Sequence, residues 1–160
     1  MSKSPITSPL GDAERESTGA VLQATLVDLI DLSLIAKQAH WNVVGPNFRS
    51  AHLQLDELVA AARQYTDDVA ERANAIGISP NGQARTVVES SGIPRYPDNW
   101  LSVEATVEAI VAALGELIKR LRKRIDETDK SDLVTQDLLI GIAAELEKQH
   151  WMWQAQTATS

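Results

Sequence analysis

Apolar residues recur at steps of three and four along four long stretches of the chain, the spacing that places them on one face of an α-helix. These stretches predict four helices, over residues 13–42, 48–76, 102–125 and 133–154. Gly77 suits the position just after the second helix, and Ser102 suits the N-cap of the third. Pro, Gly, Ser and Asn are frequent in the segment between Gly77 and Ser102, so we expect a long crossover there, with one short helix over 86–90.

The long crossover determines how the helices are arranged. A short loop would return the third helix antiparallel to the second, whereas a long connection lets the two run parallel in an all-α four-helix bundle. The first helix is apolar on more than one side, because Leu29, Ile30 and Leu32 point in different directions. It is either the central helix of a monomer or packs both inside the bundle and against a neighbouring subunit; we favour the second interpretation.

A stripe of polar residues interrupts the apolar pattern of the second helix. His52 and Asp56 are four residues apart, as are Asp67 and Glu71, so each pair lies on one helix face. From Asp56 to Asp67 the helix makes about three turns and 20°, so both pairs point in nearly one direction. The same segment rises about 16 Å, whereas a metal–ligand bond is only about 2 Å long.

One ion therefore cannot contact both pairs on a single straight helix. Either the chain holds two separate half-sites, or a second copy of the helix runs antiparallel and brings Asp67 and Glu71 beside His52 and Asp56. The midpoint of the stripe falls in the alanine run 60–62, where small side chains would allow two helices to approach closely. We favour the shared site, which a two-fold axis creates twice in each dimer.

His40 is the candidate fifth ligand. The chain must turn at Gly45 and Pro46, so we expect His40 to return beside His52. Two imidazoles and three carboxylates suit iron, zinc or manganese, and iron suits them best because carboxylates leave positions open for an oxidant. The alternative is a plain helical scaffold whose histidines are incidental and whose acidic pairs form a solvated face.

These residues resemble in type and spacing the signature of the Dps family of mini-ferritins, on His40, Trp41, Gly45, Phe48, His52, Asp56, Asp67, Glu71 and Arg72. The resemblance extends over residues 15–155 and implies a ferritin-like bundle. In that family the counterparts of His40, His52 and Asp56 come from one subunit, and those of Asp67 and Glu71 come from its two-fold mate. This division agrees with the shared site that the helix rise requires.

The resemblance also implies an enzyme, a ferroxidase. Dps proteins oxidise Fe²⁺ with H₂O₂, or with O₂, and store ferric oxide in a hollow shell of twelve subunits that protects against peroxide. Zn²⁺ and Mn²⁺ are expected competitors for the iron. Trp41, beside His40, is a candidate trap for one-electron oxidants, although simple packing explains this ring equally well.

Acidic residues cluster between the third and fourth helices, at Asp126, Glu127, Asp129, Asp132 and Asp137. In Dps shells this region lines pores on the three-fold axes that admit Fe²⁺, and the family pattern does not identify which of these acids would do so here. Their simpler role is to complement the dipole at the start of the fourth helix, for which Ser131 is the expected cap.

Some Dps proteins bind DNA through a lysine-rich tail, which makes a non-specific nucleoid protein the alternative function. The bundle is expected over residues 13–155, after a flexible tail over 1–12 whose basic residue is Lys3 and before a short tail over 156–160. The third helix ends with basic residues that we interpret as a solvated face rather than a phosphate-binding patch, at Lys119, Arg120, Arg122, Lys123 and Arg124.

The composition adds three expectations. A net charge of −7 and a pI near 4.9 argue against a general polyanion binder. The absence of cysteine excludes disulfides and is consistent with a cytoplasmic protein. No signal-peptide pattern and no run of about 20 apolar residues are visible, so we expect no membrane association.

Overall fold

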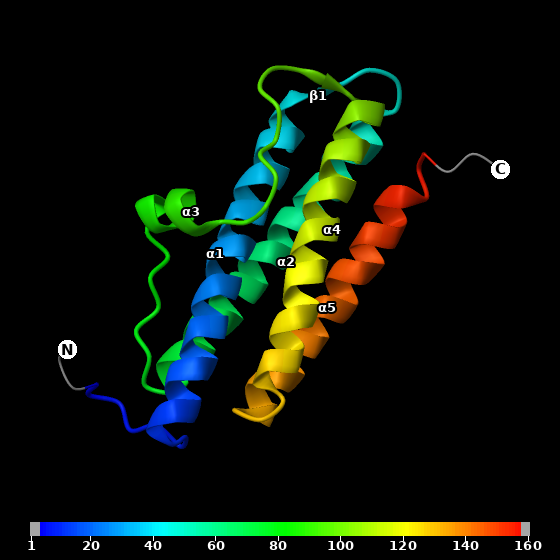
Figure 1. Cartoon of the computed structure of the whole chain (residues 1–160). Helices are drawn as coiled ribbons and strands as arrows, with labels where there is room; N and C mark the ends of the chain where they lie inside the picture. Colours follow the sequence, from blue (N-terminus) through cyan, green and yellow to red (C-terminus); the bar gives the residue numbers. More distant parts are fainter. Residues whose placement is uncertain (1–3, 158–160) are drawn as a thin grey trace.

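The computed structural model describes residues 4–157, and its helices and strands are α1 (Asp12–Asn42), β1 (Val43–Val44), α2 (Phe48–Ala75), α3 (Ala84–Ser90), β2 (Leu101–Ser102), α4 (Val103–Thr128) and α5 (Leu133–Gln154). The four long helices form a bundle in which α1 packs along α2, α4 along α5, and α1 against α4 (Figure 1). The predicted all-α fold with one short crossover helix is confirmed.

α2 and α4 run in the same direction. Both start at the end of the bundle that carries the two strands, whereas α1 and α5 end there (Figure 1). β1 pairs with β2 in parallel, with Val43 opposite Leu101. The crossover between α2 and α4 therefore returns the chain to the end at which α2 began, as its length predicted.

The buried carboxylate of Asp28 on α1 ties this crossover to the bundle. It accepts hydrogen bonds from the Gly92 N–H (3.0 Å) and from the Arg120 Nε (2.9 Å), and it contacts the Arg124 Nη2 (2.7 Å). The Arg120 guanidinium covers Gly92 so closely that a Cβ there would lie 2.2 Å from it. A residue larger than glycine at this position would displace the ion pair.

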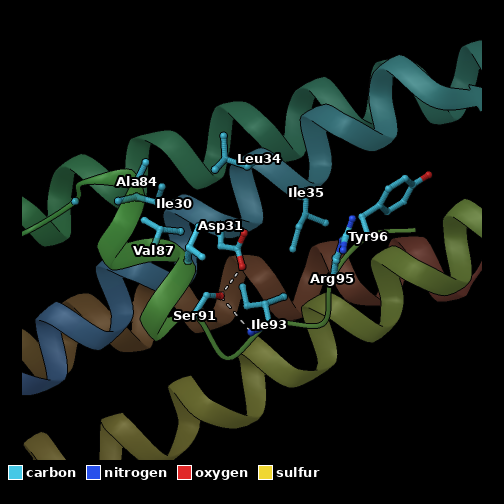
Figure 2. Close-up of a pocket in the computed structure, with 12 residues that line it drawn as sticks. Ile30, Asp31, Leu34, Ile35, Ala84, Val87, Ser91, Ile93, Arg95 and Tyr96 are labelled. Carbon is cyan, nitrogen blue, oxygen red and sulfur yellow. Dashed lines mark hydrogen bonds between the residues drawn. The ribbon is translucent and has the colours of Figure 1, made fainter. Parts of the chain in front are cut away.

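A cavity lies between α1 and the crossover (Figure 2). The Ser91 hydroxyl donates to the Asp31 carboxylate and accepts from the Ile93 N–H, which closes one side of the cavity. Leu34 on α1 and Val88 on α3 line it and remain 55 % and 85 % exposed. α1 and α3 thus each present an apolar side chain here that the bundle does not cover, and the packing of α1 against a neighbouring subunit stays a prediction.

α2 ends in a Schellman motif at the predicted glycine. Gly77 has φ +80°, its N–H bonds the carbonyl of Asn74 (2.9 Å), and the Ile78 N–H bonds the carbonyl of Ala73 (2.9 Å). At the start of α4, the Ser102 hydroxyl accepts from the Ala105 N–H (3.2 Å), so this predicted cap is confirmed as well.

The predicted cap of α5 is wrong. Asp132, not Ser131, is the N-cap, and its carboxylate accepts from the N–H groups of Val134 and Thr135. Asp132 directly precedes the first helical residue and has an extended backbone, which points its side chain at these donors. Ser131 instead accepts a hydrogen bond from the hydroxyl of Thr18 on α1 (3.0 Å).

α1 begins at Asp12, one residue before its predicted start. In the described part of the preceding segment, Leu10 packs on the core, and the Ile6 carbonyl lies 3.0 Å from where a Cβ on Gly77 would be. Lys3 lies outside the described residues, as does the end of the chain beyond residue 157. By length and composition alone α1 could cross a membrane, but 67 % of its most apolar window is buried in the bundle, which accounts for that composition.

Candidate metal centre

The short link between α1 and α2 positions two histidines face to face. Gly45 (φ +106°) and Asn47 (φ +62°) turn the chain within a few residues, so that α2 returns antiparallel along α1. His40 near the end of α1 consequently meets His52 in the second turn of α2. Their rings stack with centroids 3.6 Å apart and an interplanar angle of 22°. The predicted approach of His40 to His52 is confirmed.

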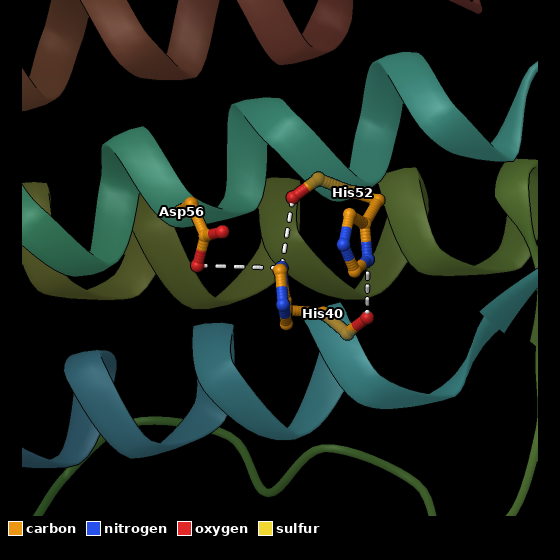
Figure 3. A group of neighbouring side chains, drawn as sticks. All are labelled: His40, His52 and Asp56. Atoms are coloured by element: carbon orange, nitrogen blue, oxygen red, sulfur yellow. Dashed lines mark hydrogen bonds and ion pairs between the residues drawn. The ribbon is translucent and has the colours of Figure 1, made fainter.

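Two reciprocal hydrogen bonds fix these rings. The Nδ1 of His40 lies 2.9 Å from the carbonyl oxygen of His52, and the Nδ1 of His52 lies 2.8 Å from that of His40 (Figure 3). A carbonyl oxygen only accepts, so each Nδ1 carries the hydrogen. In the neutral rings the lone pair then belongs to Nε2, the arrangement by which proteins orient histidine ligands of metals.

Asp56 completes a group of three. Its Oδ1 lies 3.3 Å from the His40 Nδ1 and 2.6 Å from the Nζ of Lys37, and the hydrogen bond from Lys37 lowers the pKa of the carboxyl. One donor atom from each of His40, His52 and Asp56 lies within 4.8 Å of the other two. Donors around one ion with bonds of about 2.1 Å are at most roughly 4.2 Å apart, so these side chains must reorient before the Nε2 atoms of both histidines and an Asp56 oxygen could hold a metal.

The structure leaves the other two predicted ligands apart from this group. Asp67 and Glu71 lie farther along α2 and are exposed in the single chain. Their part in a shared site stays a prediction, because it requires a second subunit. Trp41 is 67 % exposed at the end of α1, and its role also stays a prediction.

Sequence reasoning gave no role to two residues that adjoin the group. Lys37 is three residues before His40, which places both on the same face of α1. This spacing could have indicated that Lys37 lies near the metal group. Phe48 lies edge-on to the His52 ring, with centroids 6.3 Å apart and an angle of 64°.

Asp132 differs from the other candidate pore acids because it is buried and engaged. Its carboxylate pairs with Arg72 on α2 and accepts from the hydroxyl and N–H of Thr135. Burial by itself raises the pKa of Asp132, but the hydrogen bonds from Thr135 and Arg72 outweigh it, so the pKa is lowered overall. Asp132 therefore links α2 to the start of α5.

All five basic residues near the end of α4 have carboxylate partners. The pairs are Lys119–Glu116, Arg120–Asp28, Arg122–Glu147, Lys123–Glu127 and Arg124–Asp28. The Arg122–Glu147 pair is close, with Nε 2.6 Å from Oε1, and it raises the pKa of Arg122. These pairings agree with the interpretation that the basic run is not a phosphate-binding patch.

A ferritin-like domain model matches residues 19–159. A DNA protection during starvation protein of Mycolicibacterium smegmatis is 38 % identical over 146 residues, which cover 91 % of this chain and 80 % of that protein. The chain belongs to the Dps family.

Solved Dps structures share its fold. A Mycobacterium smegmatis Dps superposes with a TM-score of 0.93 at 36 % identity, covering 100 % of this chain and 91 % of that one. A Microbacterium arborescens Dps, solved in a high iron form, gives a TM-score of 0.90 at 30 % identity, covering 96 % and 99 %. The ferritin-like bundle with a long crossover is therefore the fold of this family.

Proposed function

We propose that the protein is an iron-oxidising and iron-storing mini-ferritin that protects the cytoplasm against peroxide. Fe²⁺ binds between His40, His52 and Asp56 of one subunit and Asp67 and Glu71 of the partner subunit. H₂O₂ or O₂ oxidises it, and the product is stored as ferric oxide in a shell of twelve subunits. The observation that carries this proposal is the pair of imidazoles whose Nδ1 atoms are held by carbonyl oxygens, beside a carboxylate.

The donors suit the chemistry. Imidazole nitrogens and carboxylate oxygens bind Fe²⁺, and Zn²⁺ or Mn²⁺ would compete for them. Negative carboxylates stabilise Fe³⁺ more than Fe²⁺, which favours loss of the electron. One H₂O₂ takes two electrons from two Fe²⁺ and two protons from solvent, and yields two waters. Trp41 follows His40 in the sequence and is exposed, and it would reduce any one-electron oxidant formed when H₂O₂ does not take both electrons from Fe²⁺.

The exposed half of the stripe supports a site shared between subunits. Asp67 lies on α2 about 16 Å beyond Asp56 and Glu71 one turn farther, and both face solvent in the single chain. An antiparallel copy of α2 would bring them to the first half-site. Ala60, next to the midpoint of the stripe, is exposed and small, so two such helices can approach closely there.

Subunit complementation tests this arrangement. His52→Ala and Glu71→Ala are each expected to abolish rapid Fe²⁺ oxidation by H₂O₂, followed by absorbance of the ferric product. In a mixed two-fold dimer, one site carries both lesions and the other carries neither. Random mixing of equal amounts should therefore restore about one quarter of the wild-type sites.

Subunit exchange is verified by native mass spectrometry of isotopically labelled chains. A matched control mixes His52→Ala with Asp56→Ala, two variants of the same half-site, and should restore nothing. Full activity in either single variant would overturn the proposed ligands. Verified exchange without recovery in the first mixture would overturn the shared site.

The alternative function is non-specific DNA binding, which the name of the M. smegmatis relative favours. The ion pairs of the basic run on α4 weigh against it, because each cation already has a carboxylate partner. A gel-shift assay at physiological salt separates the two functions. Retardation that weakens steeply as salt rises would support DNA binding, and we expect none.

A further inference from the structure

Lys37 stands out as a cation placed against a candidate metal ligand. It lies one turn before His40 on α1, and Asp56 lies one turn after His52 on α2. The antiparallel helices α1 and α2 thus make two neighbouring contacts, the stack of His40 on His52 and the ion pair of Lys37 with Asp56. The Lys37 Nζ is 2.6 Å from the Asp56 Oδ1, the same oxygen that the His40 Nδ1 approaches at 3.3 Å.

We propose that Lys37 is a built-in competitor for the metal ion, which occupies Asp56 in the empty site and must leave it when the ion binds. This inference rests on the proposed metal centre. An ammonium at hydrogen-bond distance from the Asp56 Oδ1 would lie within a few ångströms of a divalent ion bound to the same oxygen at about 2 Å, and the two cations would repel at that separation. Metal binding through Oδ1 therefore requires the ammonium to withdraw.

The surroundings of the pair allow this exchange. The side chain of Asp56 is 46 % exposed and that of Lys37 is 25 % exposed, so the ammonium can withdraw to solvent without being buried alone. The Asp56 carboxylate would also have to reorient to hold an ion with the histidines, because its Oδ1 now lies 3.3 Å from the His40 Nδ1, which carries a hydrogen. Release of Lys37 would free the carboxylate for this reorientation. The lysine keeps the empty site neutral and weakens its hold on any cation.

Binding of Co²⁺ to the intact oligomer tests the proposal without using turnover. Lys37→Met keeps the length of the side chain and removes its charge, and it should tighten Co²⁺ binding roughly five- to tenfold. Lys37→Arg keeps a cation at Asp56 and should bind Co²⁺ no more tightly than wild type. Lys119→Met is the matched control, since Lys119 pairs with Glu116 on α4, and should leave affinity unchanged.

Affinity is measured by isothermal titration calorimetry, and the visible bands of bound Co²⁺ report whether its coordination is the same in each variant. Size-exclusion chromatography confirms that each variant assembles. If wild type binds Co²⁺ and Lys37→Met binds it equally or more weakly, Lys37 positions Asp56 rather than competing, and the proposal is wrong. If wild type and His52→Ala bind Co²⁺ alike, the metal centre itself is wrong.

Discussion

Two aspartates of this molecule each pair with a cation on another helix, yet they serve different ends. Asp56 on α2 contacts Lys37 on α1 at 2.6 Å, and Asp132 at the start of α5 contacts Arg72 on α2 at 2.5 Å. The pKa of both carboxyls is lowered. The Asp56 side chain is 46 % exposed, however, and the Asp132 side chain is 6 % exposed.

The difference lies in how many acceptor positions are free. Asp132 accepts from two backbone N–H groups, from the Thr135 hydroxyl and from Arg72, so its oxygens are fully used. Asp56 accepts from Lys37 and approaches His40, and solvent reaches the rest of the carboxylate. A carboxylate of the first kind fixes two helices together. One of the second kind has room to bind an ion, and an ion pair alone does not distinguish the two.

The largest expected effect is on stability. Asp132→Ala removes the cap of α5 and leaves Arg72 without its partner, which should lower the free energy of unfolding by about 3 kcal/mol. Asp56→Ala should leave it almost unchanged, because a half-exposed pair contributes little. Guanidinium denaturation followed by circular dichroism measures both. Similar losses in the two variants would contradict the distinction.

Metal affinity should show the opposite order. Asp56→Asn keeps the shape of the side chain but removes a charged ligand, and it should weaken Co²⁺ binding about 50-fold. Asp132→Asn retains a capping side chain and should bind Co²⁺ within about twofold of wild type. Calorimetric titration of both variants decides the matter. Weaker binding in Asp132→Asn would show that the joint between α2 and α5 also controls the metal centre.

The smallest effect concerns pH. A carboxyl whose pKa is lower in the folded state stabilises the protein above its unfolded pKa of about 3.9, and this contribution disappears as the pH falls through the folded pKa. The stability difference between wild type and Asp132→Asn should therefore shrink between pH 5 and pH 3. Urea denaturation at several pH values measures it. A difference that stays constant would mean that the charge of Asp132 is not what stabilises the joint.

Much of this fold follows from local patterns. Apolar periodicity predicted the four long helices, and Gly77 and Ser102 marked two of their boundaries because their roles depend on neighbouring residues only. The meeting of His40 and His52 was predictable as well, since the turn at Gly45 leaves few ways for α2 to return.

Features that depend on distant segments were not predictable. Ser131 and Asp132 are both good N-cap residues, and the choice of Asp132 is reinforced by Arg72, which is 60 residues away in the chain. The pairing of Lys37 with Asp56 depends on how α1 and α2 are aligned, whereas a lysine on a helix is ordinarily solvated. The contribution of Asp67 and Glu71 requires a second chain altogether.

The brief segment between α1 and α2 has a consequence for how this family can vary. Because it is only five residues long, it sets the rotation of α2 about its own axis as well as its direction. One inserted residue that lengthened the helix start would turn the ring of His52 about 100° away from α1. It would also break both bonds between imidazole and carbonyl at once. Tolerance to insertion here should be far lower than in the long crossover, although both are surface connections.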